Sequence, residues 1–147
     1  MTALQRARIL LVDDDPAGAE LTLAALFAVE PDADVSVVAD GEEALDYLAG
    51  RSPFDRDENE PPHAVLLDLK MPKIDGHEVL REIRADPKLR ELRVVVLTSS
   101  DRERDRELSR SLGSDHYLVK PPSISALIEQ LKGCSHLFGP GSPGPLD

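Results

Sequence analysis

Four groups of side chains that can do chemistry follow short apolar runs in this sequence. They are the acidic residues Asp13, Asp14 and Asp15, the carboxylate of Asp68, the hydroxyl of Thr98 and the amine of Lys120. Carboxylates that converge repel one another, and an all-oxygen site of this kind suits Mg²⁺. A carboxylate nucleophile, a divalent cation, a lysine and a hydroxyl are the parts that phosphoryl transfer needs. The chemistry therefore depends on whether the fold brings these residues together.

Five short apolar runs predict β-strands that are mostly buried on both faces. They span residues 8–12, 35–39, 64–67, 94–97 and 115–119. Segments with helical spacing follow them and begin near Pro16, Asp40, Asp75, Arg102 and Ser123. Alternating strands and helices specify a doubly wound α/β fold with a parallel sheet. Right-handed crossovers place the carboxyl ends of the strands at one edge, so the four groups should meet there.

Apolar spacing also indicates the helix faces, and Pro16 indicates where the first helix begins. In the first helix the residues at helical spacing are Ala17, Leu21, Ala24, Ala25 and Ala28. In the last helix the residues expected to face inward are Ile124, Leu127, Ile128 and Leu131. Asp15, directly before Pro16, is expected to be a helix N-cap rather than a metal ligand.

Length and composition favour a single globular domain. The chain has 147 residues and a formal net charge of -11, which argues against nucleic acid and anionic membranes as partners. Its single cysteine, Cys134, cannot form an internal disulfide, so a cytoplasmic location is expected. No apolar stretch approaches the ~20 residues that cross a bilayer. We expect an exposed loop over residues 51–62 and a flexible tail over 139–147.

Four motifs in order carry a resemblance to a known family. V-D-D-D-P, L-L-D-L-K-M-P-K-I-D-G, V-L-T-S and Y-L-V-K-P resemble the receiver domain of two-component response regulators. The resemblance covers about residues 9–132 and assigns residues 1–138 to a receiver domain. It implies a flavodoxin-like five-stranded parallel sheet, in strand order 2-1-3-4-5, with five helices.

The resemblance also assigns the central reaction. Asp68 would accept a phosphoryl group from the phosphohistidine of a sensor histidine kinase. This would be a one-for-one transfer with slow self-dephosphorylation, rather than enzymatic turnover. Asp13, Asp14 and Asp68 would bind Mg²⁺ together with the backbone carbonyl of Lys70.

The remaining residues would bind the phosphoryl group and report its presence. Thr98 and Lys120 would contact the phosphoryl oxygens, and Tyr117 matches the aromatic switch position that responds together with Thr98. The bond between Lys120 and Pro121 is expected to be cis, as in the family.

Two departures from the commonest receiver pattern point to a subfamily. Lys120 is followed by two prolines, and the loop over residues 51–62 is an insertion before the third strand. Both features resemble single-domain receivers that work beside phytochrome-type sensor kinases. The sequence leaves open whether the chain is an effector, a relay intermediate or a phosphate sink.

Two alternative functions, a phosphatase and a pseudo-receiver, also fit parts of the sequence. The spacing of Asp13 and Asp15 is also that of the haloacid-dehalogenase-like phosphatases, which use an aspartyl nucleophile and Mg²⁺. Against it, Pro16 and Ala17 continue that motif poorly, and no segment resembles a cap domain. A pseudo-receiver without phosphoryl chemistry is disfavoured by the complete set of acidic residues.

The fourth helix, fifth strand and fifth helix are expected to form a homodimer surface. Its mixed charges run from Arg102 to Glu107 and can pair with a second copy across a two-fold axis. Leu137 and Phe138, just after the last helix, are expected to add exposed apolar contact.

Overall fold

The computed structural model describes residues 6–50 and 61–139 of the 147-residue chain. The strands are β1 (Arg8–Val12), β2 (Asp34–Val38), β3 (Ala64–Leu67), β4 (Arg93–Thr98) and β5 (His116–Val119). The α-helices are α1 (Pro16–Val29), α2 (Gly41–Ala49), α3 (Gly76–Ala85), α4 (Glu103–Ser111) and α5 (Ile124–Gly133). A short 3₁₀ helix, η1 (Ser135–Leu137), follows α5. Most of the predicted loop over 51–62, and of the predicted tail over 139–147, lies outside the described residues.

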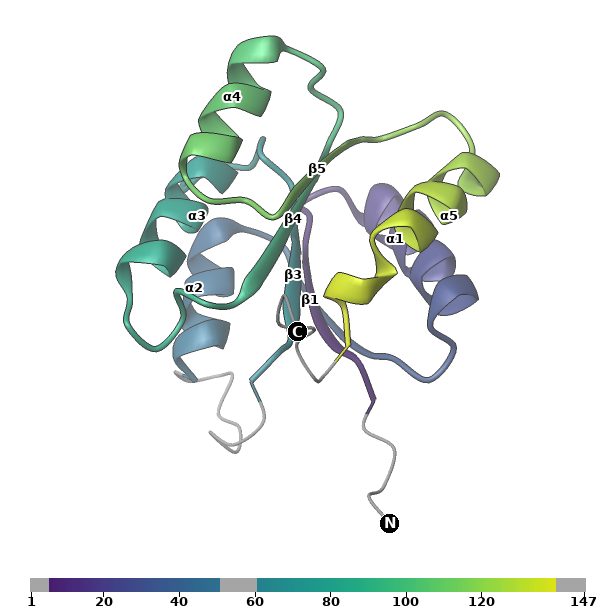
Figure 1. The fold of residues 1–147 in the computed structure, drawn as a ribbon, viewed down its shortest axis with the longest axis horizontal. Helices are drawn as coiled ribbons and strands as arrows, with labels where there is room; N and C mark the ends of the chain where they lie inside the picture. Colours follow the sequence, from purple (N-terminus) through teal and green to yellow (C-terminus); the bar gives the residue numbers. More distant parts are fainter. Residues whose placement is uncertain (1–5, 51–60, 140–147) are drawn as a thin grey trace.

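The five strands form one parallel sheet in the order β2-β1-β3-β4-β5. Figure 1 shows α1 and α5 on one face of this sheet and α2, α3 and α4 on the other. The predicted flavodoxin-like fold is therefore confirmed. Val12 pairs with Leu67, and Leu67 pairs with Val96, so β1, β3 and β4 lie level near their carboxyl ends.

Side chains alternate between two apolar clusters because successive residues of a strand face opposite sides of the sheet. Leu11 and Leu66 pack in the cluster under α1 and α5. Leu10 and Val65 pack in the cluster under α2 and α3. Both faces of the central strands are therefore buried, as the unbroken apolar runs predicted. In the described part of the chain, none of the helices is long and apolar enough to span a membrane.

The predicted faces of two helices need correction. The residues of α1 that are buried are Ala19, Thr22, Ala25 and Leu26, so of the predicted set only Ala25 is buried. Leu21 is 42% exposed, and Ile124 at the start of α5 is 36% exposed. Helix α1 is apolar almost all round, so its spacing alone could not identify the buried face. Ile124 is the first residue of α5, whereas Leu127 and Leu131, further along the helix, are buried.

The predicted exposure of Phe138 is wrong. Phe138 is fully buried in the cluster under α1 and α5, and Leu137 packs against the same cluster. The 3₁₀ turn of η1 bends the chain back toward the sheet after α5, and Arg93 donates to the Leu137 carbonyl at 3.3 Å. Phe138 therefore contributes to the core and supplies no apolar contact for a dimer.

Candidate functional site

Three carboxylates that follow β1 and β3 meet at the carboxyl edge of the sheet. Asp13 and Asp68 are buried, at 4% and 9% exposure, whereas Asp14 is exposed. Each of the three offers a carboxylate oxygen, and these oxygens all lie within 4.8 Å of one another. The backbone of Asp68 continues the ladder between β1 and β3, since its N–H donates to the Val12 carbonyl at 3.1 Å. A group of oxygen ligands this close can hold a divalent cation.

The amine of Lys120 reaches across the sheet edge to two of these carboxylates. Its Nζ lies 3.1 Å from Asp13 Oδ2 and 3.2 Å from Asp68 Oδ2. Burial acts to lower the pKa of Lys120, but the charges of Asp68 and Asp13 and the hydrogen bonds to them outweigh it. The net effect raises the pKa above its ordinary value, so Lys120 is a cation at neutral pH.

Backbone groups hold the two buried carboxylates in place. The N–H of Asp15 donates to Asp13 Oδ1 at 2.9 Å, and the N–H of Lys70 donates to Asp68 Oδ1 at 3.3 Å. Helix α3 begins directly against this loop at Gly76, whose N–H donates to the Leu69 carbonyl at 2.9 Å. A Cβ at Gly76 would lie 2.3 Å from the carbonyl oxygen of Asp68, so the close approach requires glycine.

The sequence prediction for Asp15 is confirmed. Asp15 is the N-cap of α1, and its Oδ1 accepts from the N–H of Ala17 at 3.3 Å. It is not a member of the carboxylate group formed by Asp13, Asp14 and Asp68. The metal-ligating role of the Lys70 carbonyl and the cis peptide at Pro121 stay predictions.

Thr98 and Tyr117, the two predicted switch residues, are joined through a third residue. Thr98 ends β4 fully buried, and its Oγ1 accepts from the N–H of Ser100 at 3.3 Å. Tyr117 on β5 is half-buried, and its hydroxyl donates to the Ser100 carbonyl at 2.9 Å. The guanidinium of Arg106 lies 4.7 Å from the centre of the Tyr117 ring, within cation–π range.

The polar contacts around α4 were not predicted from the sequence. Ser100 donates to Asp105 Oδ2 at 2.5 Å, and His77 on α3 lies 2.9 Å from Ser109 Oγ. Ser100 stands two residues after the predicted site residue Thr98, and this proximity was the one available signal. The partner on α4 depends on the path of the loop, which no local pattern specifies.

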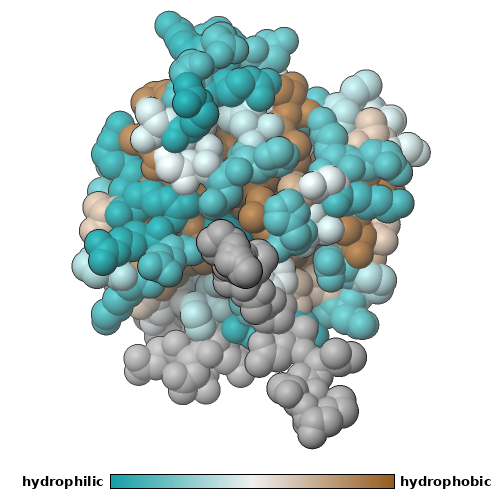
Figure 2. Space-filling model, in the orientation of Figure 1, coloured by the Kyte–Doolittle hydropathy of each residue, from teal (hydrophilic) through white to brown (hydrophobic). Residues whose placement is uncertain are grey.

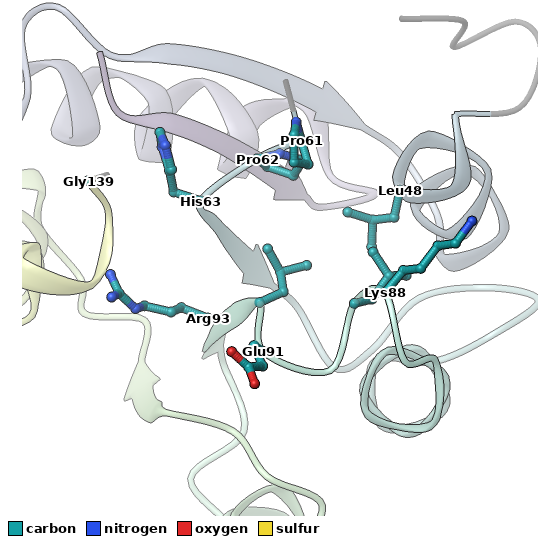
Figure 3. Close-up of a pocket in the computed structure, with 10 residues that line it drawn as sticks. Leu48, Pro61, Pro62, His63, Lys88, Glu91, Arg93 and Gly139 are labelled. Atoms are coloured by element: carbon teal, nitrogen blue, oxygen red, sulfur yellow. The ribbon is translucent and has the colours of Figure 1, made fainter. Parts of the chain in front are cut away.

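A cavity of about 290 Å³ is lined in part by His63 and Arg93. His63 directly precedes β3 and Arg93 is the first residue of β4, so the cavity lies at the amino edge of the sheet, opposite the edge that carries Asp68. Figure 3 shows that the charged ends of Lys88, Glu91 and Arg93 point in different directions rather than toward a common centre. Burial, followed by the charges of Arg8 and Arg93, lowers the pKa of His63. The cavity is therefore separate from the carboxylate site.

Comparisons with known proteins agree with this geometry. Residues 9–132 match the model of the response regulator receiver domain. The chain is 39% identical to the probable methanogenesis regulatory protein FilR2 of Methanothrix harundinacea, over 93% of this chain and 88% of that protein.

Two solved structures are also similar. The phosphorylated cyanobacterial phytochrome response regulator RcpA has a TM-score of 0.82 and 36% identity, over 91% of this chain and 94% of that one. The Mn²⁺-bound form of response regulator Rcp1 has a TM-score of 0.77 and 35% identity, over 88% and 91%. From the strand order, the grouped carboxylates and these matches together, we conclude that this chain belongs to the response regulator receiver domain family.

Proposed function

We propose that Asp68 accepts a phosphoryl group from a sensor histidine kinase in a reaction that requires Mg²⁺. The observation that carries the proposal is the grouping of Asp68 with the carboxylates of Asp13 and Asp14, with the Lys120 amine in contact with both Asp68 and Asp13. In the reaction, a bond forms between an Asp68 carboxylate oxygen and phosphorus. The bond from phosphorus to the donor imidazole nitrogen breaks, and the imidazole leaves with that electron pair.

The donor set fits a small divalent cation. At ~4 Å and an effective dielectric constant near ~20, each pair of carboxylates repels by about 4 kcal/mol. Lys120 offsets part of this repulsion, but Asp14 has no contact with it among the hydrogen bonds and ion pairs of the described residues. Asp13, Asp14, Asp68 and the Lys70 carbonyl would hold Mg²⁺, which supplies charge to offset the incoming phosphoryl oxygens.

Two side chains of the chain itself receive the phosphoryl oxygens. The Lys120 amine already lies against Asp68 and can exchange its carboxylate contact for a phosphoryl oxygen without a change of charge. The Thr98 hydroxyl can donate to a second oxygen while its lone pair keeps the bond from the Ser100 N–H. These residues would orient and stabilise the phosphorylated carboxylate. We propose that each chain takes up one phosphoryl group and loses it slowly, rather than turning over repeatedly.

An exposed apolar surface beside the site supports a helical phosphodonor partner. Leu21 on α1 is 42% exposed, Ala17 and Ala24 on the same stripe are also exposed, and Ile124 on α5 is 36% exposed. Helix α1 begins three residues after Asp13, so its first turns lie near the carboxylate site. A kinase helix packed on this stripe would place its phosphohistidine over Asp68. The similarity to RcpA supports a phytochrome-type kinase as that partner.

We also propose where the chain acts and how it assembles. Residues 1–138 act as one receiver domain in the cytoplasm, with 139–147 as a tail. A homodimer forms through α4, β5 and α5, where Figure 2 shows hydrophilic side chains over α4 at the top of the view. The support is the alternating charge of α4, since Phe138 is buried and adds nothing. Sedimentation of monomer alone, with and without phosphate, would contradict the dimer.

A haloacid-dehalogenase-like phosphatase is not favoured. The family match assigns the chain to the receivers, and the second acid of the phosphatase spacing, Asp15, caps α1. A pseudo-receiver, which has lost the acidic residues, is not favoured either, because Asp13, Asp14 and Asp68 are present and grouped.

The test uses acetyl phosphate as a small donor and intact mass as the readout. We expect the wild-type chain to gain one phosphoryl group in Mg²⁺ and none in EDTA. Asp68→Asn should gain none, whereas the matched control Asp32→Asn, an exposed aspartate on the loop before β2, should behave as wild type. Equal phosphorylation of Asp68→Asn and the control would refute the proposal.

A further inference from the structure

The peptide group between Val119 and Lys120 is held from both sides. Its N–H, which belongs to Lys120, donates to the Thr98 carbonyl at the end of β4 at 2.7 Å. Its carbonyl, which belongs to Val119, accepts from Gln130 Nε2 on α5 at 3.2 Å. A trans peptide is planar, and its C=O and N–H point in opposite directions. The first bond therefore attaches this peptide to the sheet, and the second attaches it to α5.

The second bond matters because β5 is the last strand in the order of the sheet. The Val119 carbonyl points away from β4, so it receives no donor from a neighbouring strand. The two residues after Lys120 are Pro121 and Pro122, and proline has no N–H. The second of them is one of the departures from the commonest receiver pattern, and it removes a backbone donor from this turn. Among the hydrogen bonds of the described residues, the donor that meets the Val119 carbonyl is the Gln130 amide.

The two ends of the Gln130 amide have different surroundings. Nε2 faces a carbonyl oxygen, which accepts from a nitrogen and not from an oxygen, so this contact fixes the orientation of the amide. Oε1 is buried and has no hydrogen-bond partner within the part of the chain that the structure describes. A buried acceptor without a partner lowers stability. A methionine in place of Gln130 would therefore remove an unfavourable group together with the bond to β5.

The Lys120 side chain leaves the backbone directly after this peptide and extends across the edge of the sheet. Its Nζ lies 3.1 Å from Asp13 Oδ2 and 3.2 Å from Asp68 Oδ2. Both contacts depend on the position of the Lys120 Cα and on the direction in which the side chain leaves it. The peptide that Thr98 and Gln130 hold sets both, so a rotation of that peptide would change the reach of the amine.

From this arrangement we infer that Gln130 is a positioning residue for Lys120, acting through the Val119 carbonyl. Without the Gln130 N–H, the end of β5 keeps its bond to β4 but loses its attachment to α5, and the Lys120 amine spends less time against the carboxylates. The consequence for phosphoryl transfer rests on the proposed function. The contacts of Lys120 with Asp13 and Asp68, however, exist in the chain without phosphate.

The chemical reactivity of the Lys120 amine measures these contacts without any phosphorylation. Propionic anhydride modifies the neutral form of an amine. Burial acts to lower the pKa of Lys120, but the charges of Asp68 and Asp13 and the hydrogen bonds to them raise it overall. Weaker contacts therefore give more neutral amine and faster labelling. Peptide mapping reports each lysine separately, and the exposed Lys88, on the loop after α3, serves as the internal reference.

The resting-state experiment compares Gln130→Met with Glu129→Met in EDTA. Glu129 is the adjacent residue of α5, and its side chain is 74% exposed. We expect Gln130→Met to raise the labelling rate of Lys120 relative to that of Lys88 by about twofold, and Glu129→Met to leave this ratio unchanged. Urea unfolding of both chains shows whether stability alone has changed, because a purely structural role of Gln130 would move the unfolding midpoint and leave the labelling ratio as it is.

Equal labelling ratios in folded Gln130→Met and Glu129→Met chains would overturn the inference. If Gln130→Met does not fold, Gln130→Asn takes its place. Asparagine keeps the amide but is shorter by one methylene group, so it cannot reach the Val119 carbonyl and should raise the ratio in the same way. An unchanged ratio in Gln130→Asn would then count against the inference.

A second arm adds acetyl phosphate and Mg²⁺ and follows the uptake of phosphate by intact mass. Gln130→Met should be phosphorylated at least about threefold more slowly than Glu129→Met, because a displaced Lys120 amine meets the phosphoryl oxygens less well. Equal rates in the two variants would overturn the positioning role while leaving the proposed function intact. Failure of the wild-type chain to take up phosphate would instead refute the proposed function, and the labelling of Lys120 in EDTA would still decide the role of Gln130.

Discussion

Replacing Lys120 by methionine removes the cation that contacts both buried carboxylates while keeping a flexible side chain of similar length. The side chains of Asp13 and Asp68 are 2% and 11% exposed, and each has a carboxylate oxygen within 3.2 Å of the Lys120 amine. After the substitution, these two charges remain buried beside each other without that partner. We therefore expect the folded state to be destabilised in the absence of a metal ion.

The size of the effect follows from the burial of the partners. Removing one partner of a buried ion pair costs about 3–5 kcal/mol. Because the Lys120 side chain is 25% exposed and water can reach the site, we expect the lower end, about 3 kcal/mol. For a chain of this size that corresponds to a fall in Tm of roughly 6–12 °C. A divalent cation binds the same carboxylates in the folded state only, so an excess of Mg²⁺ should reduce the difference.

The sign of the pH dependence can be stated from the direction of the Lys120 pKa. Its folded-state pKa is raised, so the stabilisation is complete below the ordinary lysine pKa and is lost only as the pH rises through the raised value. The difference between Lys120→Met and wild type should therefore be the same at about pH 7 and pH 9.

Urea unfolding followed by circular dichroism, in EDTA and in Mg²⁺, measures these differences. The matched control is Lys132→Met on α5, whose ion pair with Glu129 is exposed and should contribute less than about 1 kcal/mol. Equal stability of Lys120→Met and the control in EDTA, or a difference that Mg²⁺ leaves unchanged, would contradict a stabilising role of the Lys120 cation.

Three other predictions concern positions near or beneath the site. Gly76→Ala should lower the free energy of unfolding by about 1–3 kcal/mol and slow phosphorylation, since its Cβ would meet the Asp68 backbone. The control Gly133→Ala has open space around its Cβ, so it should leave the stability measured by urea unfolding unchanged or raise it. Cys134 is 1% exposed, and burial raises its pKa to about 11, so iodoacetamide at neutral pH should label it only after unfolding. Lys70→Ala should change the lifetime of the phosphorylated state more than its rate of formation, because Lys70 is exposed and its backbone N–H donates to Asp68 Oδ1; unchanged phosphate loss over time would contradict this.

The sequence predicts the sheet and the central residues of the site because both follow from local patterns, the apolar runs and the polar residues directly after them. Apolar runs identify the strands, and a parallel sheet places the residues after each strand at one edge. That rule alone predicts the meeting of Asp13, Asp68 and Lys120, which the structure confirms. It needs no knowledge of side-chain contacts.

The failures have different causes. In α1, alanines and leucines on all sides leave no contrast between faces, so Leu21 is exposed against the expectation from spacing. Phe138 follows a helix that ends without a periodic continuation, and its burial depends on the 3₁₀ turn that brings it back to the core. The contact of Ser100 with Asp105 depends on the path of one loop, which the local sequence does not specify.

The most direct test of the central claim is to count phosphoryl groups and locate them after incubation with a large excess of acetyl phosphate and Mg²⁺. Intact mass gives the number bound per chain, peptide mapping gives the residue, and a phosphate assay gives the amount released. We expect one phosphoryl group per chain, carried on Asp68, with slow release. A label on Asp13, or rapid release of many phosphates per chain from a phosphomonoester, would contradict a receiver and favour an aspartyl phosphatase.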